Sequence, residues 1–117
     1  MRHRKVGNKF HRKTGPRRSF VRNLANDVIR AGRVETTLAR ARAMRPLVER
    51  LVTLAKRQDL ASRRLLVKRL GNKQTAQRMF DEIAPRYKTR PGGYLRISKL
   101  SKSRKRDAAE MAVVEFV

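Results

Sequence analysis

The chain of 117 residues contains no cysteine and no tryptophan, and it has only two histidines. The absence of cysteine excludes a disulfide framework and thiolate metal sites. His3 and His11 both lie near the N-terminus, and a structural zinc site would need more ligands of the right type. The sequence therefore predicts no metal site and no cofactor.

Long apolar runs are missing as well. No stretch approaches the roughly 20 apolar residues of a membrane-spanning helix, and the N-terminal segment lacks the apolar stretch of a secretory signal. That segment resembles a mitochondrial presequence in being rich in arginine and poor in acids, but Gly7, Gly15 and Pro16 would break its helix. We therefore expect a cytoplasmic protein with no membrane partner.

Groups of residues suited to catalysis are also absent from the sequence. Asp81 and Glu82 are adjacent, so on a helix they point in different directions and form no acid–base pair. There is no glycine-rich loop of the kind that nucleotide hydrolases use, and the serines lack plausible His–Asp partners. The sequence predicts a protein that is not an enzyme and has no small-molecule substrate.

Positive charge is what the chain has in excess. Lys and Arg number 32 against 9 Asp and Glu, which gives a formal net charge of +23. Residues 1–18 hold eight Lys and Arg without an acid, and residues 86–106 hold nine without an acid. Two runs of one sign indicate an anionic partner rather than a solvated face. Nucleic acid fits better than a membrane, because the apolar helix faces are needed for the core.

Residues 1–14 are predicted to form an extended basic arm that binds RNA. A segment of this composition cannot bury a core and needs a dense anionic partner to become ordered. Arginine can stack on bases as well as pair with phosphates, and His3, His11 and Phe10 offer flat rings for unpaired bases. Solvent exposure of the histidines and packing of Phe10 on the core remain open as alternatives.

Residues 15–117 are predicted to form a single α+β domain of about four helices packed on a small sheet of about three strands. The first helix begins after Thr14 or Gly15 and ends at Gly32. Residues 33–37 alternate as a short strand. The next helix contains Pro46, which should either kink it or divide it into two segments.

The second half of the domain has equally clear local signals. Asp59 can cap a third helix that Gly71 closes, and Asn72 can cap a fourth that ends near Pro85. Residues 94–100 and 110–117 alternate like strands, so the basic residues 101–106 between them are predicted to be the tip of a hairpin.

The turn at residues 90–93 precedes Tyr94. Its two adjacent glycines could press the backbone against a phosphate while Tyr94 stacks on a base. The alternative is a plain turn that enters a strand, with Tyr94 at the sheet edge. The pattern alone leaves both interpretations open.

The residues assigned to RNA binding come from the arm, the basic face of the first helix, the paired threonines with the arginines after them, the glycine turn and the hairpin. They are Arg2, His3, Arg4, Lys5, Lys9, His11, Arg12, Lys13, Arg17, Arg18, Arg22, Thr36, Thr37, Arg40, Arg42, Arg90, Gly92, Gly93, Tyr94, Arg96, Lys102, Arg104, Lys105 and Arg106.

Several segments, in order and spacing, resemble the bacterial large-subunit ribosomal protein seventeen family over nearly the whole chain. The matching stretches are Met1-Arg2-His3-Arg4-Lys5, Arg22-Asn23, Arg33, Thr36-Thr37-Leu38, Ala41-Arg42, Met44-Arg45-Pro46, Leu54-Ala55-Lys56, Asp59-Leu60, Arg63-Arg64-Leu65, and residues 80–87 and 90–97. Residues 10–16 and 102–106 depart from the family pattern.

The resemblance implies a structural constituent of the large ribosomal subunit that binds large-subunit rRNA near the outer opening of the peptide exit tunnel. It also implies contact with neighbouring ribosomal proteins, ribosomal protein thirty-two among them, and an arm inserted in rRNA. The alternative function is a sequence-independent nucleoid DNA-binding protein, although no helix-turn-helix signature is evident. An RNA-processing enzyme is disfavoured by the missing catalytic groups.

Overall fold

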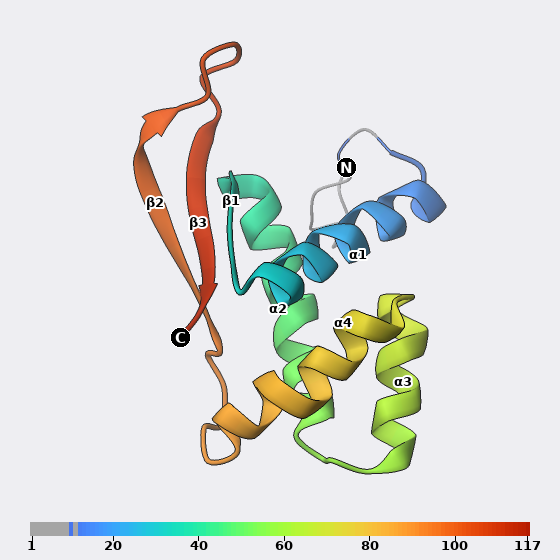
Figure 1. Ribbon diagram of the computed structural model, residues 1–117. Helices are drawn as coiled ribbons and strands as arrows, with labels where there is room; N and C mark the ends of the chain where they lie inside the picture. Colours follow the sequence, from blue (N-terminus) through green and yellow to red (C-terminus); the bar gives the residue numbers. More distant parts are fainter. Residues whose placement is uncertain (1–9, 11) are drawn as a thin grey trace, which may run out of the picture.

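The computed structural model describes residue 10 and residues 12–117 and confirms the α+β fold predicted from the sequence (Figure 1). Its elements are α1 (Thr14–Ala31), β1 (Arg33–Thr37), α2 (Leu38–Ala55), α3 (Leu60–Leu70), α4 (Lys73–Arg78), a π-helical turn (Met79–Ile83), a 3-10 turn (Ala84–Tyr87), β2 (Leu95–Ser103) and β3 (Glu110–Phe116). Residues 1–9 and 11, most of the predicted arm, lie outside the described residues.

Local capping signals set most of the helix ends. The Thr37 side chain accepts a hydrogen bond from the Arg40 amide at the start of α2, and Asn72 caps α4 in the same way. Asp59 and Ser62 form a reciprocal capping box on α3, as expected for the predicted cap. The hydrogen bonds from Ser62 lower the pKa of the Asp59 carboxyl. These short-range bonds explain why the sequence located the helices well.

Two glycines end helices in the left-handed region. Gly32 has φ 78° after α1 and Gly71 has φ 66° after α3, and each donates its backbone N–H to a carbonyl of the last turn. The start of α1 differs from the prediction, because Lys13 occupies the N-cap without a side-chain hydrogen bond and Thr14 is already helical.

Helix α2 runs through Pro46 without a break, so the predicted division into two segments does not occur. Proline inside a helix costs about 3 kcal/mol. Met44 and Val48 on either side of it are completely buried, and burying side chains of this size stabilises by about 1.5–3 kcal/mol each. Burial on both sides of the proline therefore outweighs the lost backbone hydrogen bond.

The sheet has the order β1-β3-β2, with both neighbouring pairs antiparallel, so the last strand is the central one. Strand β2 runs to Ser103, which pairs with Glu110 after an irregularity in the register. The predicted tip at residues 101–106 is therefore placed too early. Ladder pairing carries residues 101–103 into the strand, and the turn lies at residues 104–109.

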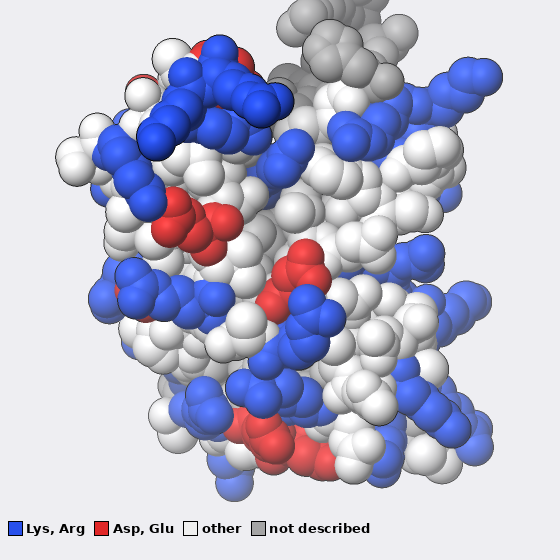
Figure 2. Space-filling model, turned by 45° about the horizontal axis from the view of Figure 1, so that its top comes forward, with Lys and Arg blue, Asp and Glu red and all other residues white. Residues whose placement is uncertain are grey.

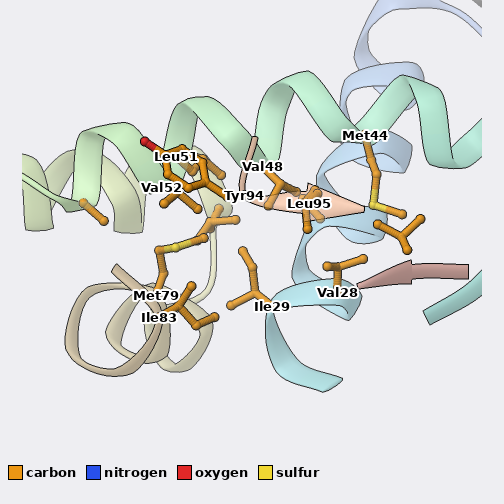
Figure 3. Close-up of a cluster of buried hydrophobic side chains, with 14 of the residues drawn as sticks. Val28, Ile29, Met44, Val48, Leu51, Val52, Met79, Ile83, Tyr94 and Leu95 are labelled. Carbon is orange, nitrogen blue, oxygen red and sulfur yellow. The ribbon is translucent and has the colours of Figure 1, made fainter. Parts of the chain in front are cut away.

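The core is one cluster centred on α2, which contacts all three strands as well as α1 and α3. Figure 3 shows the inward side chains of α2 facing those of α1 and of residues 79–83. Its largest completely buried members include Ile29, Met44, Leu51, Leu66 and Tyr94. No helix in the described part of the chain is long and apolar enough to span a bilayer.

Candidate nucleic-acid interface

A groove of about 920 Å³ lies between helices α1, α2 and α3. Each helix contributes residues spaced three or four apart, which places them on one face. Six basic side chains of the described residues rim the groove, and its floor is apolar. The basic residues are Arg17, Arg18, Arg22, Arg42, Lys68 and Arg69. The floor consists of Val21, Ala43, Pro46, Leu47 and Leu65.

Among the residues that the structure describes, no acidic side chain lines this groove. Six cations around one hollow create a concentrated positive field, and low-dielectric walls focus it. Five of the six are arginines, whose planar guanidinium groups match phosphate oxygens with two hydrogen bonds at once. In Figure 2 blue side chains project along the right-hand edge of the molecule, on the side where α1 and α3 lie in Figure 1. The arrangement fits a polyanion.

Arg22 lies at the rim of the groove beside Gly71. Its guanidinium lies against the backbone of Gly71, where an added methyl group would come within 3.5 Å of the Arg22 Cζ atom. Next to it, the Asn26 side chain donates to the Leu70 carbonyl (3.0 Å) and accepts from the Thr75 hydroxyl (2.5 Å). These bonds tie α1 to the end of α3 and to α4, next to the part of the groove wall that carries Arg22.

The hairpin is a second basic surface, and three of its six cations, Arg96, Lys102 and Arg104, are paired with acids. Lys102 lies 3.0 Å from Glu35 of β1, and Arg96 lies 4.0 Å from Glu115. Arg104 donates to both carboxylate oxygens of Asp107, and this lowers the pKa of Asp107 to about 2. Figure 2 shows blue atoms with red ones among them at the upper left, on the hairpin side.

Lys105 and Arg106, the remaining predicted residues of the hairpin, are exposed at its turn. Within the described part of the chain neither of them makes an ion pair or a side-chain hydrogen bond. With the exposed Lys99 of β2, which no described acid pairs, they are the cations of the hairpin that are available to a phosphate.

Two arginine side chains lie over the ring of Phe20 near the start of α1. The Arg12 guanidinium lies 3.9 Å from the centre of the Phe20 ring, and that of Arg40 lies 5.2 Å from it. Phe10 meets the same ring edge-on at 5.1 Å, which favours packing on the domain over stacking on a base. Lys13 is exposed, whereas the predicted residues Arg2, His3, Arg4, Lys5, Lys9 and His11 lie outside the described residues.

Tyr94 is part of the core, and its ring is not accessible from the surface. Its side chain is only 1% exposed, its ring packs beside Tyr87 at 5.2 Å, and Lys56 Nζ donates to its hydroxyl at 3.0 Å. This hydrogen bond is the largest cause that lowers the pKa of Tyr94. The predicted stacking of Tyr94 on a base has no accessible ring to support it, and the interpretation as a turn entering a strand agrees with the structure.

The turn before Tyr94 is accounted for by its own geometry. Arg90 Nε donates to the Gly92 carbonyl at 3.1 Å, and Gly93 has φ 62°, a conformation that favours glycine. The paired threonines Thr36 and Thr37 are also buried, at 8% and 9% exposure, and Thr37 is the cap of α2. Thr37 therefore has a role in the fold, and both threonines offer little surface to a ligand.

Lys68 and Arg69 are the groove residues that sequence reasoning missed. Helix α3 was interpreted through its buried leucines, and its opposite face was left without a role. The spacing of Leu65, Lys68 and Arg69 at i, i+3 and i+4 is the signal that places all three on one face. Only the docking of α3 beside α1 shows that this face joins the groove.

No group of three or more His, Cys, Asp or Glu side chains that could hold a metal ion occurs among residues 10 and 12–117. Glu82 lies 3.6 Å from Arg78 in an ion pair one helical turn away. Three acids of the helical region, Asp27, Glu49 and Glu82, each pair with an arginine of the same helical stretch.

The fold and its charge distribution define a small, strongly basic α+β protein whose helical groove fits a polyanion. Residues 20–117 match the family model of ribosomal protein L17, and the chain belongs to this family. The large ribosomal subunit protein bL17 of Persephonella marina is 51% identical over the whole chain and 95% of its own length. The bL17 proteins of Thermomicrobium roseum and Thermus thermophilus are 48% and 44% identical, over the whole chain and 99% of their lengths.

Proposed function

We propose that this chain is a structural constituent of the large ribosomal subunit in the cytoplasm and binds large-subunit rRNA through the groove, the exposed cations of the hairpin and the N-terminal arm. The observation that carries the proposal is the groove, where six cations meet without an acid. Each cation that meets a phosphate releases condensed counterions, so the affinity is large and falls steeply with salt.

The family supports a more specific placement, near the outer opening of the peptide exit tunnel, with ribosomal protein thirty-two among the neighbouring proteins. A free chain with this net charge repels itself, and bound rRNA stabilises it by mass action. The helical core then acts as a spacer between rRNA segments. The proposed role requires neither a membrane nor a small-molecule substrate.

Sucrose-gradient sedimentation of a lysate, with the chain followed by immunoblot in low and high salt, tests the proposal. A variant with Arg18, Arg42 and Lys68 changed to alanine removes three exposed groove cations. The matched control changes Arg57, Arg86 and Lys88, which are equally charged, exposed and outside the groove.

The parent chain and the control are expected to migrate with the large subunit through a moderate salt wash, whereas the groove variant is released at lower salt. A parent chain that stays at the top of the gradient would remove the ribosomal proposal. Equal retention of the groove variant and its control would remove the groove from it.

A further inference from the structure

The apolar floor of the groove indicates a ligand that offers an apolar surface as well as phosphates. A surface that only follows the backbone of a duplex uses cations and polar groups, because paired and stacked bases do not present their faces to it. An unpaired base has two flat apolar faces that gain from leaving water. Val21, Leu47 and Leu65 are only partly buried in the free chain and leave such a surface open under the cationic rim.

The size of the groove points to a short occupant. Its volume of about 920 Å³ lies within the range of roughly 300–1,000 Å³ that encloses small-molecule ligands in proteins. This space suits one or two nucleotides, whereas a double helix would rest on the rim and leave the floor empty.

Pro46 lies on this floor although it is inside a helix. Proline there costs about 3 kcal/mol relative to alanine, and this proline is exposed, so packing against the core does not require it. Its ring also borders two smaller hollows beside the groove. A rigid apolar ring at this position offers a platform for a flat ligand.

Arg22 contributes a guanidinium group to the rim, next to the backbone of Gly71. The Gly71 backbone beside it and the hydrogen bonds of Asn26 hold its surroundings in one arrangement. Its planar guanidinium can stack on a base or pair with a phosphate.

We infer that the groove takes an unpaired nucleotide of a single-stranded rRNA segment, with the base on the apolar floor and the flanking phosphates on the cationic rim. The inference rests on the proposed function, because it names the form of rRNA that the groove accepts. It assigns recognition of an unstacked base to the floor and salt-dependent affinity for the phosphates to the rim.

The test uses the purified full-length chain with a fluorescein-labelled single-stranded RNA hexamer of mixed sequence and a 16-base-pair RNA duplex. Ala43→Asp places a carboxylate on the floor. Ala61→Asp is the matched control, since it adds the same charge at an exposed position of α3 outside the groove. Circular dichroism verifies that both variants keep the helical content of the parent.

Ala43→Asp should weaken hexamer binding at least tenfold, and weaken duplex binding less, while Ala61→Asp stays within about twofold of the parent. Pro46→Ala, which removes the ring and favours the helix, should weaken hexamer binding about threefold without changing the salt slope, because the floor carries no charge. A 4-thiouridine in the hexamer should crosslink to residues 42–47.

Equal hexamer affinity of the Ala43→Asp and Ala61→Asp variants would overturn the inference, and so would equal losses for hexamer and duplex. Tighter binding of a labelled hexaglutamate peptide than of the hexamer would assign the groove to an acidic protein partner instead. If Ala43→Asp leaves hexamer binding unchanged while the parent chain sediments with the large subunit, the inference fails and the proposed function stands.

Discussion

The groove and the hairpin are both rich in arginine and lysine, but their charges are arranged differently. In the hairpin Lys102, Arg96 and Arg104 each lie beside a carboxylate, and Glu115 is shared with Arg33 of β1. In the groove six cations surround an apolar floor without an acid. A count of charges along the chain makes the two regions look alike, whereas their available charge differs.

The groove and the hairpin also differ in how deeply their supporting side chains are buried. This difference gives the largest expected effect, a change in the free energy of unfolding. Leu66 is completely buried on α3 behind the groove, so Leu66→Ala should lower the free energy of unfolding by about 2–5 kcal/mol. Ile97→Ala on the half-buried face of β2 should cost less, because its site is already partly open. Urea denaturation followed by circular dichroism measures both, and equal losses would contradict a rigid groove beside a lightly supported hairpin.

Charge removal should separate the regions next. Changing Arg18, Arg42 and Lys68 to alanine should weaken binding of the RNA hexamer on the order of 100-fold and reduce the slope of log affinity against log salt by about 2. Changing Arg96, Lys102 and Arg104 should reduce the slope by less than 1, because their carboxylate partners already offset them. Fluorescence anisotropy of the labelled hexamer over a salt series measures both slopes. Similar decreases in slope for the two variants would contradict the distinction between available groove cations and paired hairpin cations.

Tyr94 provides a smaller effect of a different kind. Tyr94→Phe removes the hydrogen bonds from Lys56 and to the Arg90 carbonyl and should cost about 1 kcal/mol of stability. RNA affinity should stay unchanged, because the buried ring faces the core. Thermal unfolding together with the hexamer titration tests this, and a clear loss of affinity in a stably folded variant would restore the stacking role.

The smallest effect concerns the ion pair at the hairpin turn. The pKa of Asp107 is lowered to about 2 by the hydrogen bonds from Arg104, so its contribution to stability is present above the ordinary aspartate pKa of about 4. That contribution is lost as the pH falls through about 2. An NMR titration of the carboxyl measures it, and an ordinary midpoint near 4 would show that Arg104 is free.

Asp107→Asn should release Arg104 and raise RNA affinity slightly at neutral pH. The comparison of groove and hairpin would weaken if this variant bound RNA no better than the parent chain, because acid pairing would then not limit the hairpin.

Much of the fold was predictable because its signals are local. The caps at Asp59 and Asn72 and the stops at Gly32 and Gly71 act within one helical turn, so residue types at short spacing reveal them. The π-helical turn at Met79–Ile83 was missed, since helical periodicity barely changes there. The hairpin turn was placed early because the sequence does not show the register irregularity of β2.

The candidate site was predictable only in part. Arg17, Arg18, Arg22 and Arg42 were assigned to RNA binding by charge, and the structure brings these four into the groove. The same reasoning included Tyr94, which the structure buries. Residue type alone does not distinguish an aromatic ring that meets a base from one that completes a core.

The sequence by itself determined the net charge, the absence of cysteine chemistry and the approximate positions of most helices and strands, because composition and capping are properties of the chain or of a few adjacent residues. Only the tertiary structure decided which cations share a surface. Lys68 joins Arg18 and Arg42 through helix docking, and Lys102 meets Glu35 through strand pairing. Both are contacts between residues distant in the chain, and they separate available charge from charge that is already neutralised.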